Sequence, residues 1–198
     1  MSQSPNEETN CDPKNIYGSL KFGGEKLARA YSNVFGFPVT RVRPSALYGP
    51  RCISRRVLQV FIENALRGQN LSINGDGQES LDFTYIDDLI EAVYRLAILP
   101  PVEGAPMAGA VDTLSPVAPF RIVNIAGGDN VGLERYIDAV EQALGKKATR
   151  NLLPMQTGDI PQTYADAQLL EAITGYRPST SVEIGVKAFV DWHLQHFA

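Results

Sequence analysis

Cysteine is scarce in this chain: only two of its 198 residues are cysteine, at positions 11 and 52. Two thiols are too few for a disulfide framework, and they lie too far apart in the sequence for a metal cage. We therefore expect Cys11 and Cys52 to be free thiols, as they would be in a reducing cytoplasm.

The chain also lacks long hydrophobic runs and an excess of positive charge. No stretch approaches the roughly 20 apolar residues of a membrane span. The net charge of −4 and the isoelectric point of about 5.2 argue against nucleic acid or an anionic membrane as the main partner. Residues 1–14 are polar and have no apolar signal-peptide core, so we expect a loosely held N-terminal segment.

A third absence concerns glycine. No Gly-x-Gly-x-x-Gly stands between a strand and a helix, and the glycine pairs at 23–24 and 127–128 do not have that spacing. Such a turn brings the backbone close to the pyrophosphate of a dinucleotide. The sequence by itself therefore predicts no dinucleotide pyrophosphate cradle in this chain.

What is present is an alternation of helix and strand patterns. Apolar residues at helical spacing predict helices at 15–34, 55–66, 89–97, 133–144, 166–173 and 182–197. Strands are predicted at 38–43, 71–73, 82–86 and 121–125, with a proline-rich loop over 100–119. This interleaved order is typical of an α/β fold.

A tyrosine and a lysine, Tyr17 and Lys21, stand four residues apart on one face of the first predicted helix. An ammonium near a phenol favours the phenolate, so such a pair can remove a proton from an alcohol. With 8 tyrosines and 6 lysines, chance supplies this spacing roughly one time in four. On spacing alone, a partly buried tyrosine followed by a solvated lysine is the simpler interpretation.

Further motifs change that interpretation. They lie at residues 43–50 (RPSALYGP), 75–88 (GDG, then DFTYIDD), 153–166 (LPMQTGD, then TYAD) and 175–178 (GYRP). Together with Tyr17, their order resembles the C-terminal part of the extended short-chain dehydrogenase/reductase family, the nucleotide-sugar epimerases and dehydratases. The last two motifs are most similar to the UDP-glucuronate 4-epimerase branch.

The resemblance implies a partial Rossmann-type fold, made of the catalytic helix and the last strands of the sheet, with a small α/β substrate-binding domain. Residues 15–50 would be the remnant of the NAD-binding domain. Residues 51–198 would be mainly substrate-binding, with 121–145 returning to the Rossmann sheet. The chain would then be the C-terminal portion of a longer enzyme.

The resemblance also implies roles for single residues. Tyr17 would act as base on the 4-hydroxyl of a nucleotide-diphosphate sugar while hydride passes from C4 to NAD. Lys21 would hold the nicotinamide ribose, and Pro44 and Ser45 would lie against the nicotinamide. Substrate contacts, largely through backbone around the base, are implied for a further set of positions: Ala46, Leu71, Ile73, Asn74 and Asp159.

Three positions depart from the family's pattern. Leu81 stands where an arginine usually binds the diphosphate. The local candidates to replace it are Arg51, Arg55 and Arg56, unless these belong to a solvated basic helix start. Ala46 stands where Asn or Thr commonly meets the sugar. Ile53 stands where a glucuronate epimerase is expected to place an arginine for the sugar carboxylate. These changes make UDP-glucuronate itself a less favoured substrate.

Two other features suggest sites but are better explained by local structure. His193 and His196 lie three apart without a third ligand at suitable spacing, so we expect exposed helix residues and no metal. The pair Asp87–Asp88 precedes a helical pattern, so we expect helix capping rather than carboxylate chemistry.

Three functions stay open on the sequence alone. The favoured one is UDP-sugar 4-epimerisation by a longer NAD-dependent protein, with the isolated chain inactive. The others are dehydration by a related enzyme, and a non-catalytic nucleotide-sugar-binding or oligomerisation fragment. Since the strands at 38–43 and 121–125 would lack neighbours, we also expect a homo-oligomer, with the Tyr17 helix and the helix at 55–66 as contact surfaces.

Overall fold

The computed structural model describes residues 6–13, 15–52, 56–75, 80–127, 131–154 and 164–197. The chain folds into two compact units, each built from three separate stretches of sequence. The first unit comprises Met1–Pro44, Leu89–Ala126 and Ala165–Arg177, and the second comprises Ser45–Asp88, Gly127–Tyr164 and Pro178–Ala198. The fold is α/β, as the alternation of patterns predicts.

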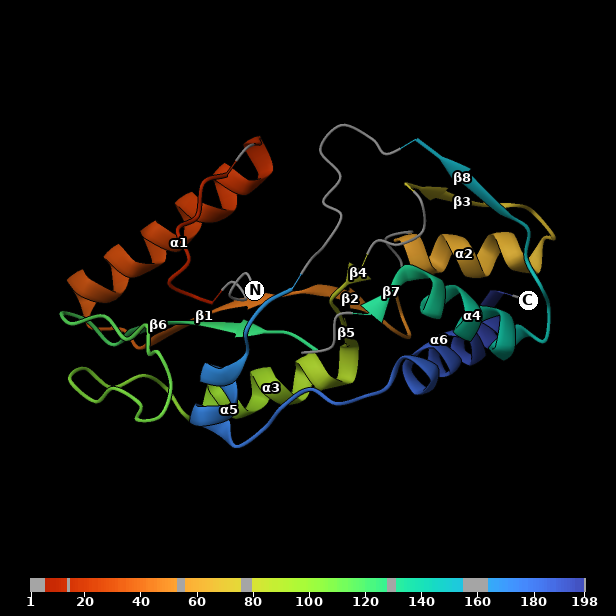
Figure 1. The fold of residues 1–198 in the computed structure, drawn as a ribbon. Helices are drawn as coiled ribbons and strands as arrows, with labels where there is room; N and C mark the ends of the chain where they lie inside the picture. The colour runs from red at the N-terminus through yellow and green to blue at the C-terminus, as the bar shows by residue number, and fades with distance from the viewer. Residues whose placement is uncertain are drawn as a thin grey trace. The chain divides into compact units, whose positions relative to one another are not determined.

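The first unit is built on two parallel strands, β1 (Val39–Pro44) and β6 (Phe120–Ile125). They pair in register from Val39 opposite Phe120 to Pro44 opposite Ile125. Helix α1 (Ile16–Phe35) lies on one face of this pair, and helices α3 (Ile86–Ile98, in this unit from Leu89) and α5 (Gln168–Thr174) lie on the other (Figure 1). Parallel pairing requires a crossover, and residues 45–119 supply it here.

Helix α1 begins and ends where its sequence dictates. The side chain of Asn15 accepts a hydrogen bond from the Gly18 N–H at 2.8 Å and so caps the first turn. Gly36 ends the helix in the left-handed conformation, with φ of 70°, and its N–H bonds to the Ser32 carbonyl. The helix predicted at 15–34 is therefore confirmed, and it is the element that carries Tyr17.

A small core holds the first unit together on the side of β6 opposite α1. Its fully buried members are contributed by α3, β6 and α5: Ala92, Leu96, Val123, Ile125, Leu169 and Leu170. Burying large aliphatic side chains contributes about 1.5–3 kcal/mol each, so this cluster anchors β6, and through pairing β1.

In the part of the second unit that the structure describes, the strands form three short pairs. β2 (Ala46–Tyr48) runs parallel to β5 (Phe83–Tyr85), and β3 (Leu71–Asn74) runs parallel to β8 (Arg150–Leu153). β4 (Ser80–Leu81) and β7 (Val131–Gly132) are antiparallel. Its helices are α2 (Val57–Leu66), α4 (Leu133–Leu144) and α6 (Val182–Phe197).

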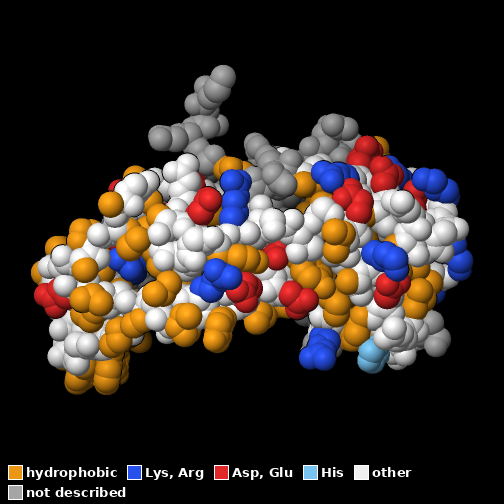
Figure 2. Space-filling model, turned by 90° about the horizontal axis from the view of Figure 1, so that it is seen from below, with side chains coloured by type: hydrophobic (Ala, Val, Ile, Leu, Met, Phe, Trp, Pro, Cys, Tyr) orange, Lys and Arg blue, Asp and Glu red, His pale blue; other side chains and the backbone are white. Residues whose placement is uncertain are grey.

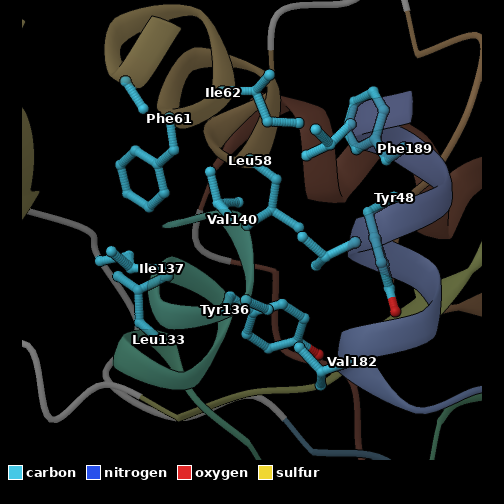
Figure 3. Packing of buried hydrophobic residues seen from close by; sticks show 14 of the residues in the cluster. Tyr48, Leu58, Phe61, Ile62, Leu133, Tyr136, Ile137, Val140, Val182 and Phe189 are labelled. Atoms are coloured by element: carbon cyan, nitrogen blue, oxygen red, sulfur yellow. The ribbon is translucent and has the colours of Figure 1, made fainter. Parts of the chain in front are cut away.

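The core of the second unit is larger and partly aromatic. Figure 3 shows residues of α2, α4, α6 and β2 packed toward a common interior, among them Leu58, Tyr136, Phe189 and Tyr48. The ring of Tyr48 meets that of Tyr136 edge to face at 5.8 Å between centroids. Burial in this cluster raises the pKa of the Tyr48 phenol, so Tyr48 stays neutral and serves packing.

The surface carries both signs of charge. On the face drawn in Figure 2, the side chains of Lys and Arg are scattered among acidic and hydrophobic ones. Among the described residues, no helix is long and apolar enough to cross a membrane. In the described part of the chain, neither Cys11 nor Cys52 forms a disulfide.

The unit boundaries differ from the domain ranges suggested by resemblance. The resemblance places residues 121–145 in the Rossmann sheet: β6 does pair with β1 in the first unit, whereas α4 packs on α2 and α6 in the second. Conversely, residues from Leu89 to Ala126 and the helix α5 join the first unit, since the core around β6 recruits them.

Two predictions about single residues are wrong. His193 is 5% exposed rather than solvated, because α6 turns it toward the interior. Asp88 was expected to cap the helix that follows it, but α3 begins at Ile86, so Asp88 lies within the first turn. Its carboxylate instead accepts hydrogen bonds from the N–H groups of Ser179 and Thr180, at 3.2 and 2.9 Å, and so holds a loop that is distant in the sequence.

Candidate active site

Tyr17 and Lys21 lie one turn apart in the first two turns of α1, as their spacing predicts. The Lys21 Nζ is 5.4 Å from the centre of the Tyr17 ring, within the range of a cation–π contact. Tyr17 is 70% exposed, and Lys21 is also exposed. The phenol and the ammonium are thus adjacent and accessible to a ligand.

Both side chains line a cavity of about 620 Å³ within the first unit. One wall comes from α1, one from the last residues of β1, and one from the segment preceding the helix. The apolar lining includes Phe22, Val42 and Pro44. Pro44 therefore lies in the same cavity as Tyr17 and Lys21, at the carboxyl end of β1, where ligands of parallel sheets bind.

A bidentate ion pair also lines this cavity. The Arg43 Nε donates to Glu25 Oε2 at 2.9 Å, and Arg43 Nη2 donates to Glu25 Oε1 at 2.6 Å. Glu25 is 6% exposed, so the ion pair with Arg43 offsets the cost of removing its carboxylate from water. Burial acts to lower the pKa of Arg43, but the bonds to Glu25 outweigh it and raise that pKa.

The segment before α1 is held more firmly than expected for residues 1–14. The Glu7 carbonyl accepts a hydrogen bond from Arg43 Nη1 at 3.0 Å, and Glu7 Oε1 accepts one from the Asn124 N–H at 2.8 Å. Glu7 is 6% exposed, and burial raises its pKa. The described residues 6–13 are thereby attached to both strands, and Cys11 lines the cavity together with Tyr17.

The remaining predicted residues belong to the second unit. Ser45 Oγ and Thr84 Oγ1 are 2.6 Å apart and share a hydrogen bond, and Ala46 pairs with Phe83. Arg51 is exposed and adopts a left-handed backbone conformation with φ of 66°, unusual for a side chain other than glycine. Such strain is concentrated at functional turns, which keeps Arg51 a candidate for a charged ligand.

Strand β3 limits what its residues can offer a ligand. Leu71 and Ile73 are 0% and 2% exposed and belong to the core of the second unit. Only their backbone is left for ligand contacts, as the sequence-based hypothesis assumed, whereas Asn74 is half-buried at the strand end. Asp159 and Ile53 lie outside the described residues.

Glu25 and Arg43 both stand in the motifs that carry the family resemblance, but sequence reasoning missed the contact between them, and it missed Glu7 and Cys11 as parts of the site. Glu25 repeats the four-residue spacing of Tyr17 and Lys21, which is the one signal that was available. In the part of the chain that the structure describes, no group of three His, Cys, Asp or Glu side chains could hold a metal ion.

Comparison with known proteins adds a family. The model of the NAD dependent epimerase/dehydratase family matches residues 1–103. A probable UDP-glucuronate 4-epimerase of Rhizobium meliloti is 43% identical over 188 residues, which are 94% of this chain and 55% of that protein. Protein CapI of Staphylococcus aureus is 33% identical over 93% of this chain and 56% of its own length. The chain thus spans about half the length of the curated relatives it matches.

Solved structures agree with these relatives. The UDP-glucuronic acid 4-epimerase of Bacillus cereus, in complex with UDP-glucuronic acid and NAD, aligns with a TM-score of 0.83 at 28% identity. The alignment covers 100% of this chain and 58% of that one. The UDP-glucose 4-epimerase of Thermotoga maritima, at 22% identity and a TM-score of 0.82, shows the same fold over 100% of this chain and 59% of its own.

Proposed function

This chain belongs to the NAD dependent epimerase/dehydratase family, and from that premise we propose that it carries the catalytic helix and the substrate-binding part of a UDP-sugar 4-epimerase. The observation that carries the proposal is the placement of Tyr17, Lys21 and Pro44 around one cavity. The names of similar relatives, UDP-glucuronate 4-epimerases, support the choice of reaction.

In this proposal, the Tyr17 oxygen takes the proton of the sugar 4-hydroxyl and later returns it. NAD, when bound, supplies the hydride acceptor and donor for C4. The Lys21 ammonium compensates the negative charge on the Tyr17 oxygen and donates hydrogen bonds to a ribose. Inversion at C4 requires the keto-sugar to present its other face before the proton and the hydride return.

The cavity suits the nicotinamide–ribose end of NAD. It offers the Lys21 ammonium as donor, with Phe22, Val42 and Pro44 as an apolar wall. The pyrophosphate end is assigned to no residue here, because the sequence has no glycine-rich turn of the required spacing. We therefore propose that the chain by itself does not bind NAD at submillimolar concentration and does not turn over substrate.

On the substrate side, we propose a UDP-sugar whose base contacts the backbone of β3 and whose ribose contacts Asp159. Ser45, Ala46 and Arg51 would meet the sugar and diphosphate. UDP-glucuronate is the first sugar nucleotide to test. UDP-glucose should be tested beside it, because Ile53 stands where an arginine for the glucuronate carboxylate is expected. A cytoplasmic location, based on the free thiols, stays a prediction.

A chimera tests the catalytic proposal. In the Rhizobium meliloti relative, the aligned 188 residues are replaced by those of this chain. We expect the chimera to interconvert UDP-glucuronate or UDP-glucose with its C4 epimer. The NMR signal of the anomeric proton measures this conversion. Tyr17→Phe should lower the rate by about 10²–10⁴-fold, the usual contribution of a general base, without loss of UDP-sugar binding.

Two further results bear on the proposal. A folded chimera that binds NAD, UDP-glucuronate and UDP-glucose without converting either sugar nucleotide would instead indicate a non-catalytic binding module. Calorimetry of the chain itself, with NAD and UDP added separately, checks the binding prediction, and tight NAD binding would contradict it.

A further inference from the structure

The charges around Lys21 have two possible arrangements. Lys21 lies four residues after Tyr17 and four residues before Glu25, so helix geometry places it beside both. Its ammonium can approach the Tyr17 ring, as it does here at 5.4 Å, or pair with the Glu25 carboxylate. An ion pair with a carboxylate is the stronger attraction of the two, so something must keep Glu25 occupied.

Arg43 occupies it. Both oxygens of Glu25 accept hydrogen bonds from Arg43, at 2.6 and 2.9 Å, in the fork arrangement that only an arginine makes. The third nitrogen of Arg43 donates to the Glu7 carbonyl, which fixes the guanidinium from a second segment. Because Glu25 is 6% exposed, water competes little for its oxygens.

We infer that Arg43 is a positioning residue of the site: by holding the Glu25 carboxylate against β1, it prevents Glu25 from pairing with Lys21 and keeps the Lys21 ammonium beside Tyr17. The catalytic meaning of this arrangement rests on the proposed function, but the arrangement itself does not. Other charged or ionisable groups share a hollow with Glu25. They are Cys11, Asp12 and Arg41 in the cavity described above, and Glu8, Lys26, Arg29 and Asp112 in a neighbouring hollow.

The direct test is an NMR measurement on the chain without ligand. The ε-methylene signals of Lys21, assigned through Lys21→Arg, should be displaced by the ring current of Tyr17, and Tyr17→Leu should remove the displacement. In Arg43→Gln, we expect most of the displacement to be lost, because the released Glu25 carboxylate attracts Lys21. In the double variant Arg43→Gln/Glu25→Gln, the displacement should return.

The double variant separates this mechanism from simple loss of positive charge or of packing. With either of those causes, the displacement would stay lost in the double variant, as it is in Arg43→Gln. Arg41→Gln is the matched control, since Arg41 lines the same cavity and its Nε has no hydrogen-bond partner among the described residues; its Lys21 signals should stay as in the wild type.

Arg43→Lys covers the case in which Arg43→Gln does not fold. A lysine keeps the charge but cannot grip both oxygens, so about half of the displacement should be lost. The proposal is overturned if the Lys21 ε-methylene signals keep their full displacement in Arg43→Gln. If only Arg43→Lys folds, full displacement in that variant overturns it. In the chimera, Arg43→Gln should lower kcat more than it raises KM, and the double variant should recover kcat. If the chimera is inactive but the NMR signals change as expected, the proposed epimerase function is rejected, while the role of Arg43 in positioning Lys21 stands.

Discussion

His193 shows how a single buried residue links stability to pH. Burial lowers its pKa below the ordinary value of 6.5, with Glu63 opposing this and Arg67 adding to it. The unfolded chain therefore binds a proton at a higher pH than the folded chain does, so stability falls as the pH drops below about 6.5. The free energy of unfolding, measured with urea, should differ less between pH 8 and pH 5.5 for His193→Gln than for the wild type. Equal differences for the two proteins would contradict this.

Gly185 shows how closely helix α6 packs against Tyr48. A Cβ at this position of α6 would lie 2.8 Å from the Cζ of Tyr48, which is itself 3% exposed and cannot move aside. Gly185→Ala should therefore cost about 1–3 kcal/mol in the free energy of unfolding. Gly23→Ala in α1 is the control: apart from its chain neighbours and the backbone of its own helix, no atom of the described residues lies within 4 Å of the place that its methyl group would take. This substitution should gain about 0.5–1 kcal/mol. If alanine raises the free energy of unfolding at both positions, helix propensity rather than contact with Tyr48 determines the effect at Gly185.

At the scale of residues, spacing could predict the site only where its members share one helix, and Pro44 on β1 was expected through the family resemblance alone. Tyr17 and Lys21 could be found because four-residue spacing is visible in the sequence. The partner of Glu25 could not, because Arg43 lies on a strand and reaches Glu25 only once α1 packs on β1. The burial of His193 could not be predicted either, since three-residue spacing on α6 does not say which face is buried.

The loop between α3 and β6 depends on one buried ion pair. Arg121 of β6 donates to both oxygens of Asp112, at 2.8 and 2.9 Å, and both side chains are 5% exposed. Asp112 also accepts the N–H groups of Met107 and Leu114. Burial acts to raise the pKa of Asp112, but these bonds outweigh it and hold the pKa below its ordinary value.

Asp112→Asn should thus destabilise the first unit by about 3–5 kcal/mol, because Arg121 keeps a buried charge without a counterion. Glu183→Gln is the matched control: its pair with Arg135 has the same 2.8 Å distance but is about half exposed, and its loss should cost less than about 1 kcal/mol. Guanidinium unfolding followed by circular dichroism measures both. Similar losses for the two variants would show that burial does not set the strength of these pairs.

At the scale of elements, the helices at 133–144 and 182–197 could be predicted because their apolar residues repeat over three or more turns. Strands β2, β4, β7 and β8 could not, since none exceeds four residues and period-two alternation needs a longer run. β3 and β5 are equally short and could be predicted, at 71–73 and 82–86. Their pairing is decided by partners far away in the chain, as with β3 and β8.

At the scale of the whole molecule, the chain exposes the apolar side of α1. Large hydrophobic residues on this helix are more than half exposed: Ile16, Leu20, Leu27, Tyr31, Val34 and Phe35. Helix α2, the other contact surface expected from the sequence, instead buries Leu58, Phe61 and Ile62 in the second core. Because contiguous apolar patches of this kind drive association, we keep α1 as the surface through which two copies would pair.

Leu27→Glu should weaken that pairing. A carboxylate in the middle of the apolar stripe must be desolvated when two helices meet, which costs several kcal/mol and shifts the equilibrium toward monomer. Ile184→Glu is the control, because Ile184 on α6 is 65% exposed, much as Leu27 is at 59%. Sedimentation velocity at micromolar concentration should show dimers or larger species for the wild type and Ile184→Glu, and monomer for Leu27→Glu. A monodisperse wild-type monomer, or equal effects of both substitutions, would exclude α1 as the contact.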